Sequence, residues 1–216
     1  MNLFKENKKL IVITSIIILL PVLAGLLLWD QLPDRIPVHF GIDDQPDGFS
    51  SKAFAVFGIP CFMLIIQYLC IFVSQADPKK QNVSGKAFSL VLWIIPVVSI
   101  LCLSLIYMYA LGAKVEVGFV IMMFMGFMLT VIGNYMPKFK QSYTLGIKTP
   151  WTLANEETWR ATHRLAGILW TVCGILIMVA ALLRQYLPAI IIFAVMVIVP
   201  LAYSYFHYRN TQKQIG

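Results

Sequence analysis

The 216-residue chain has few charged residues: Asp, Glu, Lys and Arg together make up 12% of it, about half of the roughly 25% typical of soluble globular domains. Hydrophobic residues make up 59%. A water-soluble domain needs more polar surface than this composition provides, and a disordered chain needs low hydrophobicity. The composition therefore predicts an integral membrane protein.

Cysteine is also scarce, and the motifs of common enzymes are missing. The four cysteines, Cys61, Cys70, Cys102 and Cys173, lie in apolar stretches without a C-x-x-C pair, so we interpret them as packing residues and not as a zinc or redox site. The sequence contains no G-x-S-x-G, H-E-x-x-H, P-loop or dinucleotide-binding pattern. We therefore predict no catalytic residue, no cofactor and no metal site.

The chain does contain six apolar windows without a single Asp, Glu, Lys or Arg. They are residues 10–29, 53–75, 87–111, 117–136, 165–183 and 189–206. Each is long enough to cross a hydrocarbon core of about 30 Å as a helix, and none alternates as a barrel strand would. The windows predict an all-α, six-helix transmembrane bundle. Their lack of charge argues against a pump or a proton-coupled transporter.

The distribution of Lys and Arg predicts the orientation. If the N-terminus is inside, 13 of the 17 basic residues fall in inner segments, as the positive-inside rule requires. Both termini are then cytoplasmic in a multi-pass protein of the cell membrane, and the first window is an uncleaved span and not a signal peptide. The net charge of +7 is explained by anionic lipid at the inner leaflet, so no nucleic-acid partner is predicted.

The predicted outer loop, residues 30–52, reads DQLPDRIPVHFGIDDQPDGFSSK and holds five of the ten acidic residues. We expect an extended segment over residues 36–40 and a turn at Pro46-Asp47-Gly48, so the loop is structured. His39 and the nearby aspartates suggest a metal site, but the EF-hand pattern fails because Phe54 stands twelfth from Asp43 where Glu is needed. We interpret the loop as a solvated acidic surface.

The predicted inner loop, residues 137–164, is basic and aromatic. Thr149-Pro150-Trp151 interrupts any helix, and Asn155 is a suitable N-cap for a new one. Trp159 and His163 are four residues apart and share a helix face. We expect a short interfacial helix that feeds directly into the fifth span. Two interpretations stay open: an anchor that contacts lipid headgroups, or a docking face for a cytoplasmic partner.

Small and amide residues inside the spans predict helix contacts. Gln67 and Asn134 are the two amides well inside spans, and such residues more often bridge helices than bind substrate. Gly126 and Gly133 are seven residues apart, as are Gly167 and Gly174. Each pair predicts a seam for close helix packing.

Both loops resemble those of a known family. The outer loop has Leu32 to Phe40 followed by Gln45-Pro46-Asp47-Gly48, and the inner region has Gly133-Asn134, Gly146 to Leu153, Trp159 and His163-Arg164. With the six-span layout, these residues resemble the SdpI family of bacterial membrane proteins over nearly the whole chain. The resemblance implies a two-span unit, residues 1–75, followed by a four-span unit, residues 76–216.

The resemblance also implies a function. The family's best-known member gives immunity to a secreted, membrane-active peptide toxin and captures a cytoplasmic transcriptional repressor when the toxin is present. We therefore expect membrane lipid, a hydrophobic or cationic peptide and a repressor as partners, and no enzyme. The expected toxin face of the outer loop is Pro37, His39, Phe40, Asp43, Asp47 and Gly48. The expected partner face of the inner loop is Asn134, Gly146, Lys148, Thr149, Pro150, Trp151, Thr152, Trp159, His163 and Arg164.

The chain departs from the family pattern at three positions. Lys148 stands where members usually carry Arg, Ser142 where they often carry Asn, and Ala166 where they often carry a second Gly. Lys148 keeps the positive charge but lacks the planar fork with which Arg grips carboxylate or phosphate.

Two other functions stay open at this stage. A transporter of a small molecule or lipid would need a polar path, for which Gln67, Tyr107, Tyr109 and Asn134 are the candidates. A membrane-embedded enzyme would need His39 and two aspartates around a metal. We expect neither.

Overall fold

The computed structural model confirms an all-α membrane architecture. It describes residues 1–41, 43–83, 85–185 and 187–215; for residues 214 and 215 it describes the backbone only. Within these ranges six helices are long and apolar enough to span a membrane. They are α2 (Lys8–Leu27), α3 (Ile59–Ala76) with the preceding π-helical turn η1 (Phe54–Gly58), α5 (Lys86–Ala110), α6 (Val117–Tyr135), α8 (Glu156–Leu182) and α9 (Leu187–Ile215).

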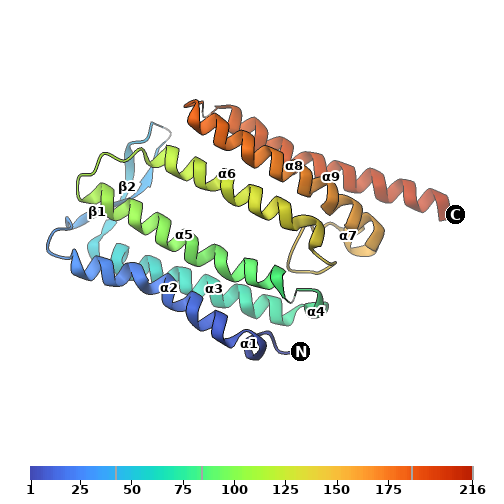
Figure 1. Ribbon diagram of the computed structural model, residues 1–216, viewed down its shortest axis with the longest axis horizontal. Coiled ribbons are helices and arrows are strands. Elements are labelled where there is room, and N and C mark those ends of the chain that lie inside the picture. Colours follow the sequence, from blue (N-terminus) through green and yellow to red (C-terminus); the bar gives the residue numbers. More distant parts are fainter. Residues whose placement is uncertain (42, 84, 186, 216) are drawn as a thin grey trace. The chain divides into compact units, whose positions relative to one another are not determined.

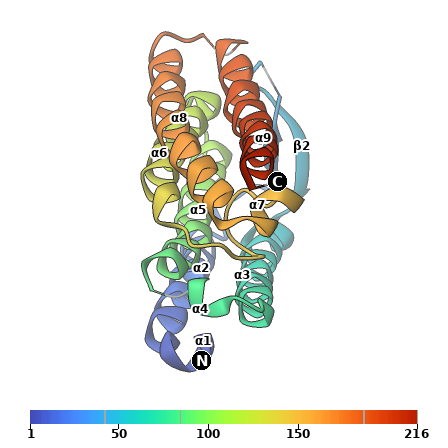
Figure 2. The ribbon, with the colours of Figure 1, turned by 90° about the vertical axis from the view of Figure 1, so that its right-hand side faces the viewer.

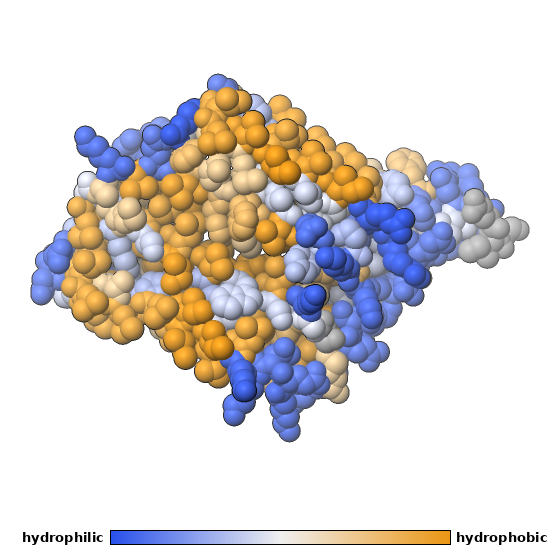
Figure 3. Space-filling view, viewed as in Figure 1, coloured by the Kyte–Doolittle hydropathy of each residue, from blue (hydrophilic) through white to orange (hydrophobic). Residues whose placement is uncertain are grey.

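The helix boundaries follow the predicted windows except at the start of α8 and at the end of α9, which continues to Ile215 beyond the predicted end at residue 206. Helix α8 begins at Glu156, nine residues before the predicted fifth span, because the Asn155 side chain caps it by accepting a hydrogen bond from the Thr158 N–H. The expected interfacial helix and the fifth span are therefore one continuous helix. Figure 3 shows hydrophobic side chains over the flanks of the helices and hydrophilic ones gathered at their ends.

The helices form two compact units, Met1–Ala76 with Ser84–Gly118, and Asp77–Val83 with Phe119–Gly216. In unit 1, α2 packs against both α3 and α5, and a two-stranded sheet of β1 (Arg35–Phe40) and β2 (Pro46–Ser51) lies at one end (Figure 1). A short helix, α1 (Leu3–Glu6), precedes α2. Packing thus groups α5 with the first two spans. The division at residues 75 and 76 describes sequence segments and stays a prediction.

Two buried hydrogen bonds connect the spans of unit 1. The Gln67 amide donates to the Thr14 hydroxyl on α2 at 2.7 Å, and the Ser99 hydroxyl on α5 donates to the Ile18 carbonyl at 3.0 Å. Both satisfy polar groups that hydrocarbon would leave without a partner. The predicted role of Gln67 as a bridge between helices is confirmed.

Unit 2 contains α8 and α9, which pack along each other, and three short helices: α4 (Lys80–Val83), η2 (Met136–Lys138) and α7 (Pro150–Ala154). Figure 2 shows α7 beside α8 and α9. The Trp170 indole N–H on α8 donates to the Met196 carbonyl on α9 at 3.1 Å. This bond fixes one helix against the other near the middle of α8.

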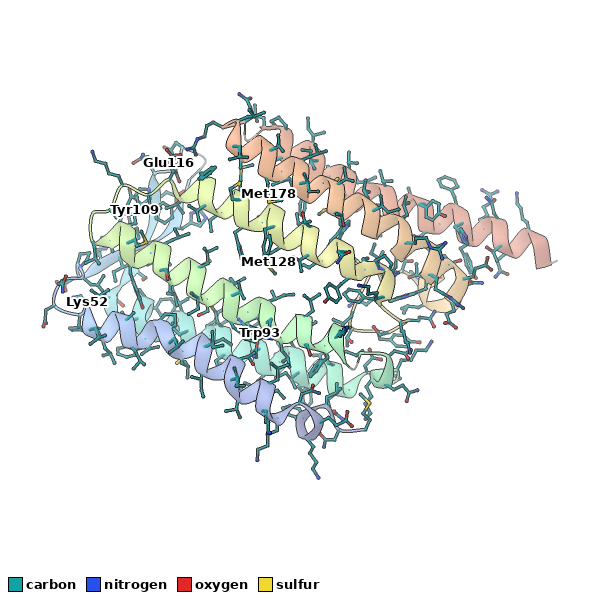
Figure 4. The ribbon with its side chains drawn as sticks, in the orientation of Figure 1. Lys52, Trp93, Tyr109, Glu116, Met128 and Met178 are labelled. Carbon is teal, nitrogen blue, oxygen red and sulfur yellow. The ribbon has the colours of Figure 1, made fainter. Side chains whose placement is uncertain are left out.

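The predicted glycine seams of α6 and α8 are confirmed as sites of close packing, and the structure places them against each other. A Cβ added at Gly126 would lie 2.6 Å from the Gly174 carbonyl oxygen, and one at Gly174 would lie 2.5 Å from the Gly126 carbonyl oxygen. Near the other end, Gly133 and Gly167 make a similar close approach. A Cβ at Gly126 would also lie 2.6 Å from Cγ of Met178 on α8; Figure 4 labels Met178. The two backbones can approach this closely only because no side chain separates them.

We expect Gly174→Ala to reduce stability by about 1–3 kcal/mol, because the new methyl group would overlap backbone atoms of α6 that cannot rotate away. Unfolding in detergent micelles, followed by circular dichroism, measures this loss. Gly118→Ala is the control, since its Cβ would lie 3.4 Å from the nearest atom, in a side chain. An equal loss for both variants would contradict the glycine seam.

Candidate functional site

The outer loop folds into a β-hairpin. Strand β1 contains the predicted extended segment, and it pairs antiparallel with β2. The predicted turn at Pro46-Asp47-Gly48 is wrong, because these residues begin β2. The reversal lies earlier: the Gly41 N–H donates to the Gln45 carbonyl, and Asp44 takes a positive φ of 61°. Pro46 is tolerated as the first residue of a strand.

The hairpin brings His39, Asp47 and Gly48 together. His39 pairs with Gly48 across the strands, and its Nδ1 lies 2.5 Å from Asp47 Oδ1. Both side chains are exposed, His39 by 72% and Asp47 by 55%. A Cβ at Gly48 would lie 2.7 Å from the Cβ of His39, so the strands approach this closely because residue 48 is glycine. The register is irregular on both sides of His39, which aims its ring outward.

The other predicted members of the toxin face differ in their exposure to solvent. Asp43 is exposed. Pro37 is buried at the base of the hairpin, and Phe40 turns toward α5, where its ring packs edge-on against Tyr109 with centroids 4.9 Å apart. Figure 4 shows Tyr109, with Lys52 and Glu116, at this end of unit 1. Pro37 and Phe40 therefore hold the hairpin on the helices.

Asp44, one of the aspartates near His39, has a structural role that the sequence did not predict. Its carboxylate accepts a hydrogen bond from the Gly118 N–H at 2.7 Å, in the first turn of α6. A carboxylate there is favoured by the free N–H groups and by the helix dipole. Asp44 thus ties the hairpin tip to the start of α6.

Lys52 fixes the end of the hairpin next to α3. Its ammonium group donates to the Trp29 carbonyl at 3.1 Å, lies 5.3 Å from the centre of the Trp29 ring and 3.5 Å from the Asp34 carboxylate. Across the described residues no group of three or more His, Cys, Asp or Glu side chains is placed to hold a metal ion. The exposed side chains of His39, Asp43 and Asp47 give the hairpin a polar and acidic surface.

The inner loop is held by a buried pair of rings on α8. The rings of Trp159 and His163 stack with centroids 4.0 Å apart, and both residues are fully buried. The Trp159 indole N–H donates to the Phe139 carbonyl at 2.8 Å. The Ile147 N–H donates to His163 Nε2 at 2.9 Å, while His163 Nδ1 lies 2.8 Å from the Trp159 carbonyl. Because Nε2 accepts a hydrogen bond, the ring is neutral, with its proton on Nδ1.

Gly146 is required next to these rings for two reasons. Its φ is +103°, which L side chains rarely adopt, and a Cβ would lie 2.3 Å from His163 Nε2. We call Gly146, Ile147, Trp159 and His163 the latch, because they fasten the loop to α8. The latch explains in physical terms why glycine, tryptophan and histidine occur at this spacing.

The segment after the latch forms a helix where the sequence analysis expected only an interruption. Thr149 caps α7 at Pro150, and the side chains of Thr149 and Thr152 each bond the other's backbone N–H. Proline at the first helical position suits this geometry. Trp151 then extends from α7 to α9, where its indole N–H donates to the Ser204 hydroxyl at 2.5 Å. The loop is thereby bound to both α8 and α9.

A further buried network was missed by the sequence analysis. The Asp77 carboxylate, 3% exposed, accepts hydrogen bonds from the Lys79 N–H, the Tyr143 N–H and the Thr144 hydroxyl at 2.7–2.9 Å. Gln141 bonds the carbonyls of Thr152 and Leu153 and accepts from the Lys79 ammonium group. Asp77-Pro78 is a turn signal in the sequence, but nothing there shows which segment the carboxylate binds.

The expected partner face is therefore two sets of residues. Gly146, Thr149, Thr152, Trp159 and His163 hold the loop in place, and Trp151 is half-buried. The exposed members are Asn134, Lys148, Pro150 and Arg164. Lys148 donates to the Thr144 carbonyl at 3.2 Å. Of the family departures, Ser142 bonds Leu145 within the loop and Ala166 is fully buried.

We expect Gly146→Ala to open the latch, because it forces an unfavourable φ, which costs about 1–3 kcal/mol, and drives a methyl group into the His163 ring. Hydrogen exchange should then speed up at the Ile147 amide. Gly112→Ala is the control: its φ is +86°, but a Cβ there would have nothing within 4 Å. Slow exchange at Ile147 in Gly146→Ala would show that the latch tolerates a side chain.

Comparison with known proteins finds similarity in two segments of the chain. Residues 138–204, which contain the latch, match the model of the SdpI/YfhL protein family, and residues 16–64, which contain the hairpin, match a domain of unknown function, DUF1648. The chain is 28% identical to the "Immunity protein SdpI" of Bacillus subtilis (strain 168) over 207 residues, which cover 92% of this chain and 96% of that protein. No solved structure gives a significant match. Its C-terminal region is therefore similar to the SdpI/YfhL family, and nearly the whole chain is similar to one immunity protein.

Proposed function

We propose that this protein gives a bacterium immunity to a membrane-active peptide toxin. The observation that carries the proposal is the similarity to the Bacillus subtilis immunity protein, which extends over almost the full length of both chains and includes the hairpin and the latch. A shared short domain would leave room for a different overall function. A likeness that includes all six spans and both loops supports a similar task.

The distribution of charge supports an orientation with both termini in the cytoplasm. The segments that contain the latch and the termini carry most of the basic residues, whereas the outer loop, residues 30–52, which contains the hairpin, carries five of the ten acidic ones. In this orientation the hairpin faces outward, where a secreted toxin arrives. The latch and α7 then lie at the cytoplasmic surface.

The hairpin offers a surface that suits a cationic or amphipathic peptide. Along β2 the exposed residues alternate as Asp47, Phe49 and Ser51, and His39 adds its ring next to Asp47. Exposed Asp43 adds negative charge at the tip. Acidic groups attract a basic peptide, and Phe49 provides apolar contact for its hydrophobic side.

We expect His39→Ala and Asp47→Ala to weaken protection at least fivefold, measured as the toxin concentration that halves growth of a sensitive strain expressing the protein. Asp30→Asn is the matched control, because it removes an exposed negative charge outside the strands. Protein levels are compared by immunoblot of membranes. Full protection by both hairpin variants would rule out this face, and killing of cells with the unchanged protein by every toxin of this class would rule out immunity.

We further propose that the inner loop relays the presence of the toxin to a cytoplasmic repressor. The latch residues are buried, so a partner would contact the exposed residues around them, of which Lys148 is a cation in the loop itself. Its Nζ already bonds the Thr144 carbonyl at 3.2 Å, which fixes the charge in place. A change at Trp151 would test this contact less directly, because it would also remove the hydrogen bond from the Trp151 indole to Ser204 on α9.

We expect Lys148→Ala to reduce membrane recruitment of a fluorescent fusion of the cognate repressor severalfold while protection from the toxin is kept. Lys140→Ala, which removes another exposed cation of the same loop, should leave recruitment unchanged. Fluorescence microscopy with and without toxin measures recruitment. Loss of protection together with recruitment would contradict separate roles for the hairpin and the inner loop.

Transport and catalysis receive less support. Gln67, a candidate for a polar path, uses its amide nitrogen to bond Thr14. His39 pairs with a single carboxylate, that of Asp47, and the name of the Bacillus subtilis relative describes immunity and not a reaction.

A further inference from the structure

A pocket of about 810 Å³ lies in unit 2 between α8 and α9. Its lining combines two cations, two apolar side chains and two polar aromatic rings. They are Arg160, Arg164, Leu165, Ile168, Tyr203 and His207. None of the latch contacts described above involves these side chains, so the pocket is a separate feature of the α8–α9 pair.

The pocket lies where both helices change from polar to apolar. On α8, charged residues end at Arg164 and none follows up to Leu183. On α9, residues 187–206 contain no charge, and Arg209 is the first charged residue after them. Two independent helices thus place the edge of the hydrocarbon at the same pocket. Tyr and His at this level suit the interfacial region, where amphipathic rings collect.

The chemistry of the lining selects an amphiphilic anion. Arg160 and Arg164 are four residues apart on α8, so both guanidinium groups lie on one helix face, and guanidinium forms paired hydrogen bonds to phosphate oxygens. One turn further, Ile168 is 63% exposed and begins an exposed apolar strip with Val172 and Ile175. A free phosphate ion would use the cations and leave this strip bare.

Two carboxylates limit the positive charge of the pocket. Glu157 lines it, and Glu156 lies 3.5 Å from Arg160. That ion pair is exposed and therefore weak, so Arg160 keeps donors for a second anion. Glu157 can accept hydrogen bonds from hydroxyl groups. The Glu157 carboxylate next to two guanidinium groups favours a headgroup that has both a phosphate and hydroxyls, as phosphatidylglycerol does.

We propose that this pocket binds an anionic phospholipid, with the phosphate against Arg160 and Arg164 and the first part of an acyl chain against Leu165 and Ile168. Basic pockets between transmembrane helices bind such headgroups by the same physics. A bound lipid would join the ends of α8 and α9, next to the bond between Thr158 Oγ1 and His207 Nδ1 at 3.3 Å. The proposal needs a membrane protein but does not rest on immunity or on repressor capture.

The test uses the purified full chain in detergent, with dioleoyl phosphatidylglycerol or dioleoyl phosphatidylcholine added, and native mass spectrometry to count bound lipid. The unchanged protein should retain phosphatidylglycerol at least fivefold more than phosphatidylcholine. Arg160→Gln with Arg164→Gln should abolish this preference. Lys138→Gln with Lys140→Gln, which removes two exposed cations of unit 2 outside the pocket, should keep it. A preference that survives the arginine changes, or that both double variants lose equally, would overturn the proposal.

Two further measurements use the unchanged protein, so their results do not depend on whether the variants fold. In the unchanged protein, raising the ionic strength from about 0.1 to about 0.5 M should weaken retention of phosphatidylglycerol more than that of phosphatidylcholine. Glycerol 3-phosphate at millimolar concentration should not displace the lipid, because it has no acyl chain for Ile168. Displacement would assign the pocket to a soluble phosphate, and an absent salt effect would exclude the arginine contacts.

Discussion

The need to pair every backbone N–H and C=O group inside hydrocarbon governs this structure. Water is absent there, so the spans are helices, and irregular backbone is confined to their ends. The two loops that carry the family's characteristic residues are such ends. Each must satisfy its backbone groups by hydrogen bonds other than those of a helix. The hairpin does so with a short sheet and Asp44, and the inner loop does so with Asp77, Gln141, Thr152 and His163.

The inner loop shows how a buried polar network can prepare an exposed surface. His163 and Trp159 accept and donate hydrogen bonds to backbone groups that water would otherwise need to reach. Because such networks are costly when half satisfied, the loop has one well-defined conformation. Lys148 and Pro150 are then presented outward from a rigid base. The residues that dominate the family pattern are in this view largely those that build the base, and the chemistry of contact belongs to their exposed neighbours.

The spans, the capped start of α8, the extended segment of β1 and the glycine seam were all predictable. Each depends on local signals: continuous apolar runs, Asn155 before two glutamates, β-branched residues near Pro37, and glycines at a helical repeat. The turn of the hairpin was misplaced because Pro46-Asp47-Gly48 has turn chemistry but close contact with His39 needs Gly48 in a strand. The helix at Pro150 was missed because its capping box has Thr152 at the third helical position, where the usual pattern has Glu or Gln.

By itself, the sequence determined the membrane class, the number of spans and the two loops where polar chemistry collects, because these follow from how apolar runs and charges are distributed along the chain. Only the tertiary structure decided which loop residues are buried and which are exposed. The sequence placed Trp159 and His163 on one face, but not against Gly146. It placed Arg160 and Arg164 together, but not opposite Tyr203 and His207. Such pairings depend on how α8 packs against its neighbours, and hydrogen bonds between distant segments leave no pattern in a single sequence.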